Sequence, residues 1–335
     1  MRNLVFITLL ILVFLPKKIL PQACSDPGLC TIGTLFTATA ADTVSGIDYK
    51  NTGLDALMNA AVVSEKFNVG AEMGYGGGDR RTSVYSLFLR GGIRIKEKIM
   101  LGIKIPYVFA DGDLGSANGL GDITINWQHV FKSGNNLRMA YTFGMVIPTN
   151  DGNLKAGGES LPMVYQSSLG FYGAMAGVTM STKRWNMSLG YQQNFGRNGN
   201  EFITDSLILD PMLTGYDTLN RKRLGYGSSK QLQNGGDVML RIEHTYNYKK
   251  LSLAVGVLPI YRVTNSTIIL ENGKTQEVAK SGGLTFNLTG GLSYRIDRDW
   301  LVGINGGFPV INRKVAPDGL RRHTVILLRI TRKFW

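Results

Sequence analysis

The feature that most constrains this chain is a period of two residues that recurs along most of its length. In GLGDITINWQHVF, which begins at Gly119, every second residue from Ile123 to Phe131 is apolar, aromatic or histidine, and those between are polar except Val130. Successive side chains of a β-strand point to opposite faces, so this stretch predicts a strand with one apolar and one polar face. A helical period does not fit.

The same alternation divides residues 65–335 into roughly twelve segments. Their expected bounds are 66–75, 82–95, 98–109, 120–132, 136–148, 163–180, 184–195, 236–247, 250–263, 282–295, 299–311 and 320–335. Short and long connections alternate between them. Outer-membrane barrels have an even number of such strands, with short periplasmic turns and longer extracellular loops. The sequence therefore predicts an all-β fold, a transmembrane antiparallel β-barrel of about 12 strands.

The composition of the two faces separates this barrel from a soluble β-sandwich, the alternative fold. The polar faces are rich in Gly, Ser, Thr, Asn and Gln, and aromatic residues such as Trp127, Trp185 and Trp300 lie towards strand ends. Amphipathic rings are stable at headgroup depth, and a closed barrel satisfies its backbone groups without water. The apolar face is therefore predicted to meet lipid, in the outer membrane of a Gram-negative bacterium.

The N-terminus predicts export. Arg2 precedes the unbroken apolar run LVFITLLILVFL, which ends at Leu15. This run is too short to span a membrane as a helix, and it has the order of a secretory signal. Residues 1–23 are predicted to be a signal peptide cleaved after Ala23, with an uncleaved N-terminal anchor as the alternative.

Residues 24–64 do not join the alternation. They contain the only two cysteines, Cys24 and Cys30, which in an oxidising compartment favour a short disulfide loop. A lipid-modified Cys24 is the alternative. The segment fits a periplasmic tail, an extra strand or a plug in the lumen, and the sequence does not choose among them.

The net charge and the placement of the charged residues limit the classes of partner. The formal net charge is +13, and removal of Arg2, Lys17 and Lys18 with the signal leaves +10. The basic residues are spread along the chain and form no nucleic-acid motif, so no nucleic-acid partner is expected. The polar strand faces place charged residues in the lumen, where they would face solute: Lys66, Glu72, Arg90, Arg94, Lys104, Asp122, Arg138, Arg241, Glu243, Arg295 and Arg329.

The excess of Arg and Lys on these faces favours anionic solutes, as basic rings do in anion pores. The alternative is a network of ion pairs that fills a narrow barrel.

Catalysis is not expected. The only histidines are His129, His244 and His323, and the first two fall on the lipid-facing side near short turns. There is no Gly-x-Ser-x-Gly, His-Glu-x-x-His or phosphate-loop motif. The alternative of an outer-membrane lipid hydrolase is therefore not supported, because the sequence lacks the catalytic motif that it would need. No metal or cofactor is predicted.

The block from GLGDITINWQHVF through YTFGMVIPTNDG to GVTMSTKRWNMSLGYQQNF resembles the outer-membrane transporter family linked to the meta-cleavage pathway of phenol degradation, which is related to long-chain fatty-acid channels. The matching features are Gly119–Asp122 opening a strand, Pro148-Thr149 closing one, and the TKRW turn. The resemblance covers roughly residues 85–200. Asn150 departs from it, since glycine is expected there. The resemblance implies transport of solutes across the outer membrane.

Together these features predict an outer-membrane channel for passive uptake of small solutes, either anionic or aromatic and hydrophobic, with residues 24–64 or a long loop as gate. The predicted partners are the outer-membrane bilayer, its assembly machinery and a small-molecule solute, with the oligomeric state open. The alternative function is a closed structural barrel that serves as anchor or subunit of a secretion or adhesion assembly.

Overall fold

The computed structural model describes residues 66–134, 136–204, 218–319 and 324–335. The predicted signal peptide, the Cys24–Cys30 disulfide, the 24–64 segment and His323 lie outside these residues.

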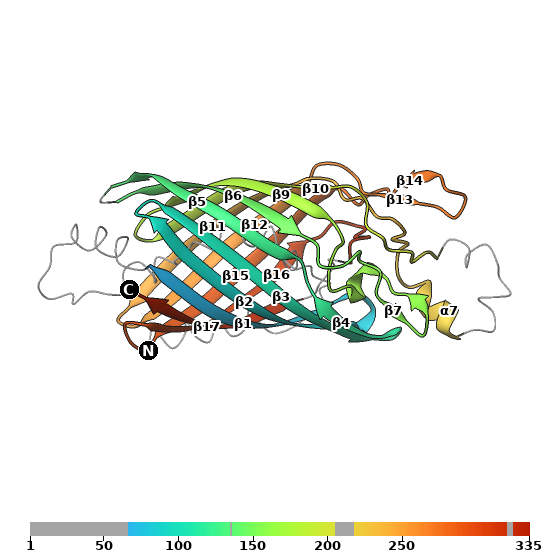
Figure 1. Ribbon diagram of the computed structural model, residues 1–335, viewed down its shortest axis with the longest axis horizontal. Helices are drawn as coiled ribbons and strands as arrows, with labels where there is room; N and C mark the ends of the chain where they lie inside the picture. Colours follow the sequence, from blue (N-terminus) through green and yellow to red (C-terminus); the bar gives the residue numbers. More distant parts are fainter. Residues whose placement is uncertain (1–65, 135, 205–217, 320–323) are drawn as a thin grey trace, which may run out of the picture.

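Twelve antiparallel strands form a closed barrel, as the alternation predicted (Figure 1). The barrel closes because the first strand pairs with the last, with Phe67 opposite Phe334. The strands are β1 (Phe67–Gly77), β2 (Ser83–Lys96), β3 (Ile99–Gly112), β5 (Ile123–Ser133), β6 (Arg138–Ile147), β9 (Tyr172–Ser181), β10 (Trp185–Phe195), β11 (Asp237–Tyr248), β12 (Leu251–Arg262), β15 (Gly283–Arg295), β16 (Trp300–Ile311) and β17 (Val325–Phe334).

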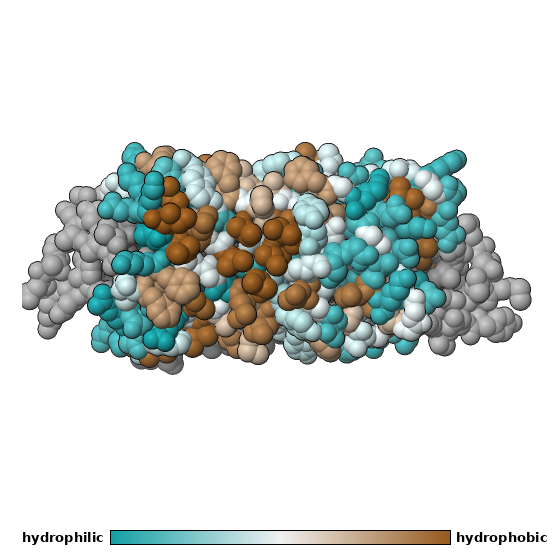
Figure 2. Space-filling view, in the orientation of Figure 1, coloured by the Kyte–Doolittle hydropathy of each residue, from teal (hydrophilic) through white to brown (hydrophobic). Residues whose placement is uncertain are grey.

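The period of two decides which face of each strand points outward. Along β10, the polar Asn186 and Gln192 are buried, whereas Trp185, Leu189 and Phe195 are exposed. Trp185 and Phe195 stand at the two ends of the strand, and a tilted strand of this length separates such aromatic ends by about 25 Å, the height of an apolar membrane band. Figure 2 shows hydrophobic residues gathered over the middle of the barrel and hydrophilic ones towards both ends.

Short turns occupy one end of the barrel and long connections the other. The short turns join β2 to β3, β5 to β6, β9 to β10, β11 to β12 and β15 to β16. The long connections carry η1 (Asp79–Arg81), β4 (Gly115–Leu120), β7 (Lys155–Ala156), β8 (Glu159–Ser160), η2 (Met163–Tyr165), α7 (Thr218–Arg223), β13 (Thr267–Ile269) and β14 (Thr275–Glu277). None of the helices in the described ranges has the length and apolar character needed to cross a membrane.

The largest error in an expected strand boundary is at the start of β9. The alternation predicted a strand over 163–180, but β9 begins only at Tyr172. Gly170 has a φ of +74°, which ends the extended chain just before β9. The preceding residues Leu161, Met163 and Val164 are apolar because they are buried among loops, not because they face lipid.

Candidate functional site

A cluster of charged side chains lies inside the middle of the barrel. Glu72 on β1 is 3% exposed and forms an ion pair with Arg90 on β2, with Arg90 Nη2 3.2 Å from Glu72 Oε2. On the other side of β1, Arg329 of β17 stands opposite Glu72 in the strand register. Two guanidinium groups therefore flank one carboxylate on this wall.

The facing wall carries a second pair. Arg241 and Glu243 on β11 are joined at 2.6 Å between Nη2 and Oε2. In the strand order β11 lies half-way round the barrel from β2, so Arg241 lies on the wall that faces Arg90 across the lumen. We call Glu72, Arg90, Arg241, Glu243 and Arg329 the charged constriction. It holds three guanidinium groups against two carboxylates, so its sign is positive.

The other charged residues predicted for the lumen take different places. Lys104 is buried, with its Nζ 4.2 Å from the centre of the Phe88 ring. Arg94 donates to the carbonyl of Glu97 in a short turn. Arg138 and Arg295 are half-buried near the short-turn end, and Lys66 is exposed at the rim there.

Asp122 lies at the opposite end, where it anchors a loop. Its carboxylate accepts hydrogen bonds from the Ser168 hydroxyl and, at 3.0 Å, from the Leu169 N–H. This finding differs from the predicted solute-facing role, because both carboxylate oxygens are engaged by the connection between β6 and β9.

Several inward-facing polar atoms have no protein partner among the described residues. They include the Nε donors of Arg90, Arg138 and Arg329, and both amide atoms of Asn126. Because buried polar groups are normally hydrogen-bonded, such atoms are placed to bind water or a polar solute.

Glycines make room for amides that lie along the inner wall. Asn126 has Gly102 and Gly144 as its cross-strand neighbours. A Cβ at Gly144 would overlap Asn126 Oδ1, and one at Gly291 would overlap the amide oxygen of Asn305. The glycines of the polar faces therefore leave room for amide side chains along the inner wall.

The long connections fold together over the mouth of the barrel. We call residues 148–171, 196–204, 224–236, 263–282 and 312–319 the mouth cap. Its centre is η2, in which Met163, Val164 and Tyr165 are almost completely buried. Met163 packs with Phe171, Leu232 and Ile268, which come from three different connections.

The cap bridges opposite sides of the mouth. Gly319 lies in the connection between β16 and β17, half-way round the barrel from the β6–β9 connection that carries η2. A Cβ at Gly319 would overlap the backbone nitrogen of Val164. Asn198, from the β10–β11 connection, places its Nδ2 3.2 Å from Met163 Sδ. Segments from three connections thus meet over the lumen.

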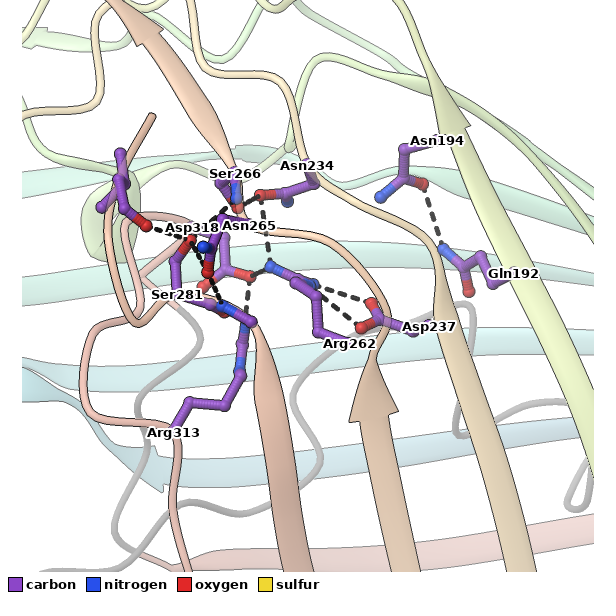
Figure 3. Close-up of polar contacts among 12 residues, drawn as sticks. Gln192, Asn194, Asn234, Asp237, Arg262, Asn265, Ser266, Ser281, Arg313 and Asp318 are labelled. Carbon is purple, nitrogen blue, oxygen red and sulfur yellow. Dashed lines mark hydrogen bonds and ion pairs between the residues drawn. The ribbon is translucent and has the colours of Figure 1, made fainter. Parts of the chain in front are cut away.

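A buried ion-pair cluster ties the cap to the barrel wall (Figure 3). Arg262, at the end of β12, binds Asp237 at the start of β11 through two hydrogen bonds of 2.9 and 2.7 Å. Its Nη1 also donates to Asp318 in the cap at 2.5 Å. Arg313 binds the same Asp318 carboxylate at 3.2 Å and donates to the Ser281 carbonyl. We call Asp237, Arg262, Arg313 and Asp318 the latch.

The latch holds its members ionised. Burial by itself would raise the pKa of Asp318, but the guanidinium groups of Arg313 and Arg262 outweigh it and hold the pKa well below the usual range of a carboxyl. Arg262 is buried between the carboxylates of Asp237 and Asp318 and forms an ion pair with each. A buried pair of this kind is stable only as a complete set.

Sequence reasoning missed the latch. The alternation places Arg262 on the inward face of its strand, but nothing in the sequence joins it to Asp318, which lies 56 residues later in a loop. The same holds for Tyr165, whose buried hydroxyl accepts from the Leu114 N–H and contacts the hydroxyl of Tyr226.

A closed antiparallel barrel with an apolar outer band, short turns at one end and long loops at the other defines an outer-membrane β-barrel protein. The location predicted from the sequence, the outer membrane of a Gram-negative bacterium, follows from this fold. The short-turn end is periplasmic and the mouth cap is extracellular.

Among solved structures the chain is similar to the KdgM porin (11% identity, TM-score 0.41, covering 80% of this chain and 99% of that one) and the NanC porin (10% identity, TM-score 0.46, covering 79% and 100%). It is also similar to the transport unit of the autotransporter AIDA-I from Escherichia coli (9% identity, TM-score 0.42, covering 90% and 97%). No family model and no curated protein matches the sequence. The resemblance to the phenol-pathway transporters therefore stays a prediction, and function is argued from the residues.

Proposed function

We propose that this barrel is a channel for passive uptake of small, polar, anionic solutes across the outer membrane. The observation that carries the proposal is the charged constriction, in which three guanidinium groups outnumber two carboxylates at one level of the lumen. Unscreened positive charge on a narrow wall raises the local concentration of anions and lowers their entry barrier.

The lumen wall favours an anionic over an aromatic or hydrophobic solute, the two classes left open by the sequence. At the level of the constriction the inward side chains are charged, and nearby ones such as Asn126, Gln128 and Thr142 are amides or hydroxyls. The inward apolar residues Val146, Met175, Met239 and Leu258 form a separate cluster.

The mouth cap acts as the gate in this proposal. Its segments meet over the lumen from opposite sides, so a solute from outside enters only when the cap moves. The latch is the contact that holds the cap to the wall, because Asp318 lies in the cap and Asp237 and Arg262 lie on barrel strands.

Replacing Arg90, Arg138 and Arg329 together with glutamine should shift the reversal potential in a salt gradient towards cation preference. Each of these arginines has a buried Nε that forms no hydrogen bond with any of the residues that the structure describes. Their loss leaves the carboxylates of the constriction in excess. Planar-bilayer recordings of the purified protein would measure the shift.

The matched control is Glu72→Gln, which removes the carboxylate between Arg90 and Arg329. It should shift the reversal potential in the opposite direction, and both shifts should shrink at high salt because the Debye length falls to about 3 Å near 1 M. A wild-type barrel that prefers cations would contradict the proposed solute class.

The latch also predicts how conductance depends on pH. Because the folded pKa of Asp318 is depressed, its ion pairs stabilise the closed cap fully above the ordinary carboxyl pKa of about 4 and weaken as the pH falls below it. Conductance should therefore be constant from about pH 7 to about pH 4 and rise only in stronger acid. A rise centred near pH 6 would point to a different group.

The alternative function, a closed barrel that anchors a secretion or adhesion assembly, predicts a different result. Such a barrel would show no solute-selective conductance even after the latch is broken and residues 24–64 are deleted. Liposome swelling with sugars and with organic acids would separate the two functions.

A further inference from the structure

Exposed cations lie at both ends of the barrel, but the ion pairs that the described residues form at its ends all lie on the extracellular side. At the extracellular end, Lys155 is paired with Glu201, Arg223 with Glu159, and Arg313 with Asp318. At the periplasmic end, every short turn carries or adjoins an exposed cation: Lys96, Lys98, Lys132, Arg184, Lys249 and Lys250 in four turns, and Arg298 in the fifth.

Two further exposed cations complete the ring at the seam of the barrel. Lys66 precedes β1 and Arg332 lies near the end of β17. We call these nine residues the basic collar. The described acids beside it are Glu97, Asp297 and Asp299, and none of the ion pairs in the described part of the chain involves a collar member.

The collar lies at the level of lipid-facing aromatic rings. The Arg332 guanidinium is 4.8 Å from the Phe334 ring and 5.4 Å from the Trp300 ring, and Arg298 is 4.8 Å from that of Trp335. Lys249 lies 5.4 Å from the ring of Tyr248, which is 69% exposed. Exposed aromatic rings of this kind mark the depth of the lipid headgroups.

We propose that the basic collar binds the anionic phospholipid headgroups of the periplasmic leaflet, and so fixes the depth and orientation of the barrel. The collar surrounds the barrel, as a leaflet does, whereas a protein partner would contact one sector. Its cations form no ion pair with any carboxylate of the described residues, and each basic residue held near an anionic leaflet strengthens binding about fivefold. This inference does not depend on the proposed channel function.

The tryptophans provide the measurement. Of the four in the chain, Trp185 and Trp300 begin their strands and Trp335 follows β17. Trp127 faces outward in the middle of β5, not towards the strand end as predicted from the sequence. Brominated acyl chains quench tryptophan fluorescence on contact. The full-length protein is reconstituted into mixtures of phosphatidylethanolamine and phosphatidylglycerol, with bromine on one lipid or the other.

Brominated phosphatidylglycerol should quench the wild-type protein with a relative affinity about fivefold above that of brominated phosphatidylethanolamine. In the variant with Lys96, Lys98, Lys249 and Lys250 replaced by glutamine, this ratio should fall clearly below the wild-type value, because four of the nine collar cations are removed. These lysines lie in two turns on opposite sides of the barrel. High salt should lower the wild-type ratio as well.

The matched control replaces four extracellular lysines, Lys222, Lys274, Lys280 and Lys314, with glutamine and changes the net charge equally. It should keep the wild-type ratio. The proposal is overturned if the wild-type ratio is already near one, as a protein partner for the collar would give, or if both variants lower it equally. Heat-modifiable migration on gels verifies that each variant is folded.

Discussion

The Asp318→Asn variant should conduct far more often than the wild-type protein. The asparagine cannot neutralise Arg313 or share the charge of Arg262, so a buried ion pair between cap and wall is broken. Breaking such a pair by removing one partner costs about 3–5 kcal/mol, and about 3 kcal/mol shifts an equilibrium more than a hundredfold. Single-channel recording would report the shift as a higher open probability.

A retained ion pair and a control variant make this result specific to the cap. Asp237 still binds Arg262 in the variant, so the pairing of β11 with β12 is retained. The control is Glu201→Gln, which removes an exposed pair at 3.7 Å with Lys155. Exposed pairs contribute about 0–1 kcal/mol, so this control should conduct like the wild type. If D318N conducts no more often while its barrel is folded, the latch does not hold the gate.

Arginine at Phe143 should destabilise the barrel, whereas arginine at its neighbour Thr142 should be tolerated. Phe143 is 52% exposed on the lipid face of β6, and Thr142 is buried on the inward face opposite Gly177. An arginine turned to lipid near mid-membrane costs about 2–4 kcal/mol, whereas the lumen offers polar neighbours. Urea unfolding in vesicles would measure both variants.

A substitution on β3 tests the same assignment of lipid-facing and inward-facing residues. Ile103 is exposed on the lipid face, and its neighbour Gly102 faces inward beside Asn126. Ile103→Arg should therefore lower the unfolding midpoint as Phe143→Arg does. Equal losses from Phe143→Arg and Thr142→Arg would contradict the assignment of Phe143 to lipid and Thr142 to the lumen.

The sequence alone determined the barrel because its information is local and repeated. The period of two fixes which side chains of a strand share a face, and the alternation of short and long connections fixes which end is which. The twelve strands, and the inward positions of Arg90 and Arg241, follow from counting residues along each strand.

The tertiary structure decided what these inward residues contact. The pairing of Arg90 with Glu72, and the position of Arg241 on the facing wall, depend on how the sheet closes, which no single strand encodes. The contacts within the mouth cap could not be predicted from the sequence, because loops have no periodic pattern that indicates which residues meet. Asp318 meets Arg262, and Gly319 meets Val164, only because the barrel brings the ends of distant strands to one rim.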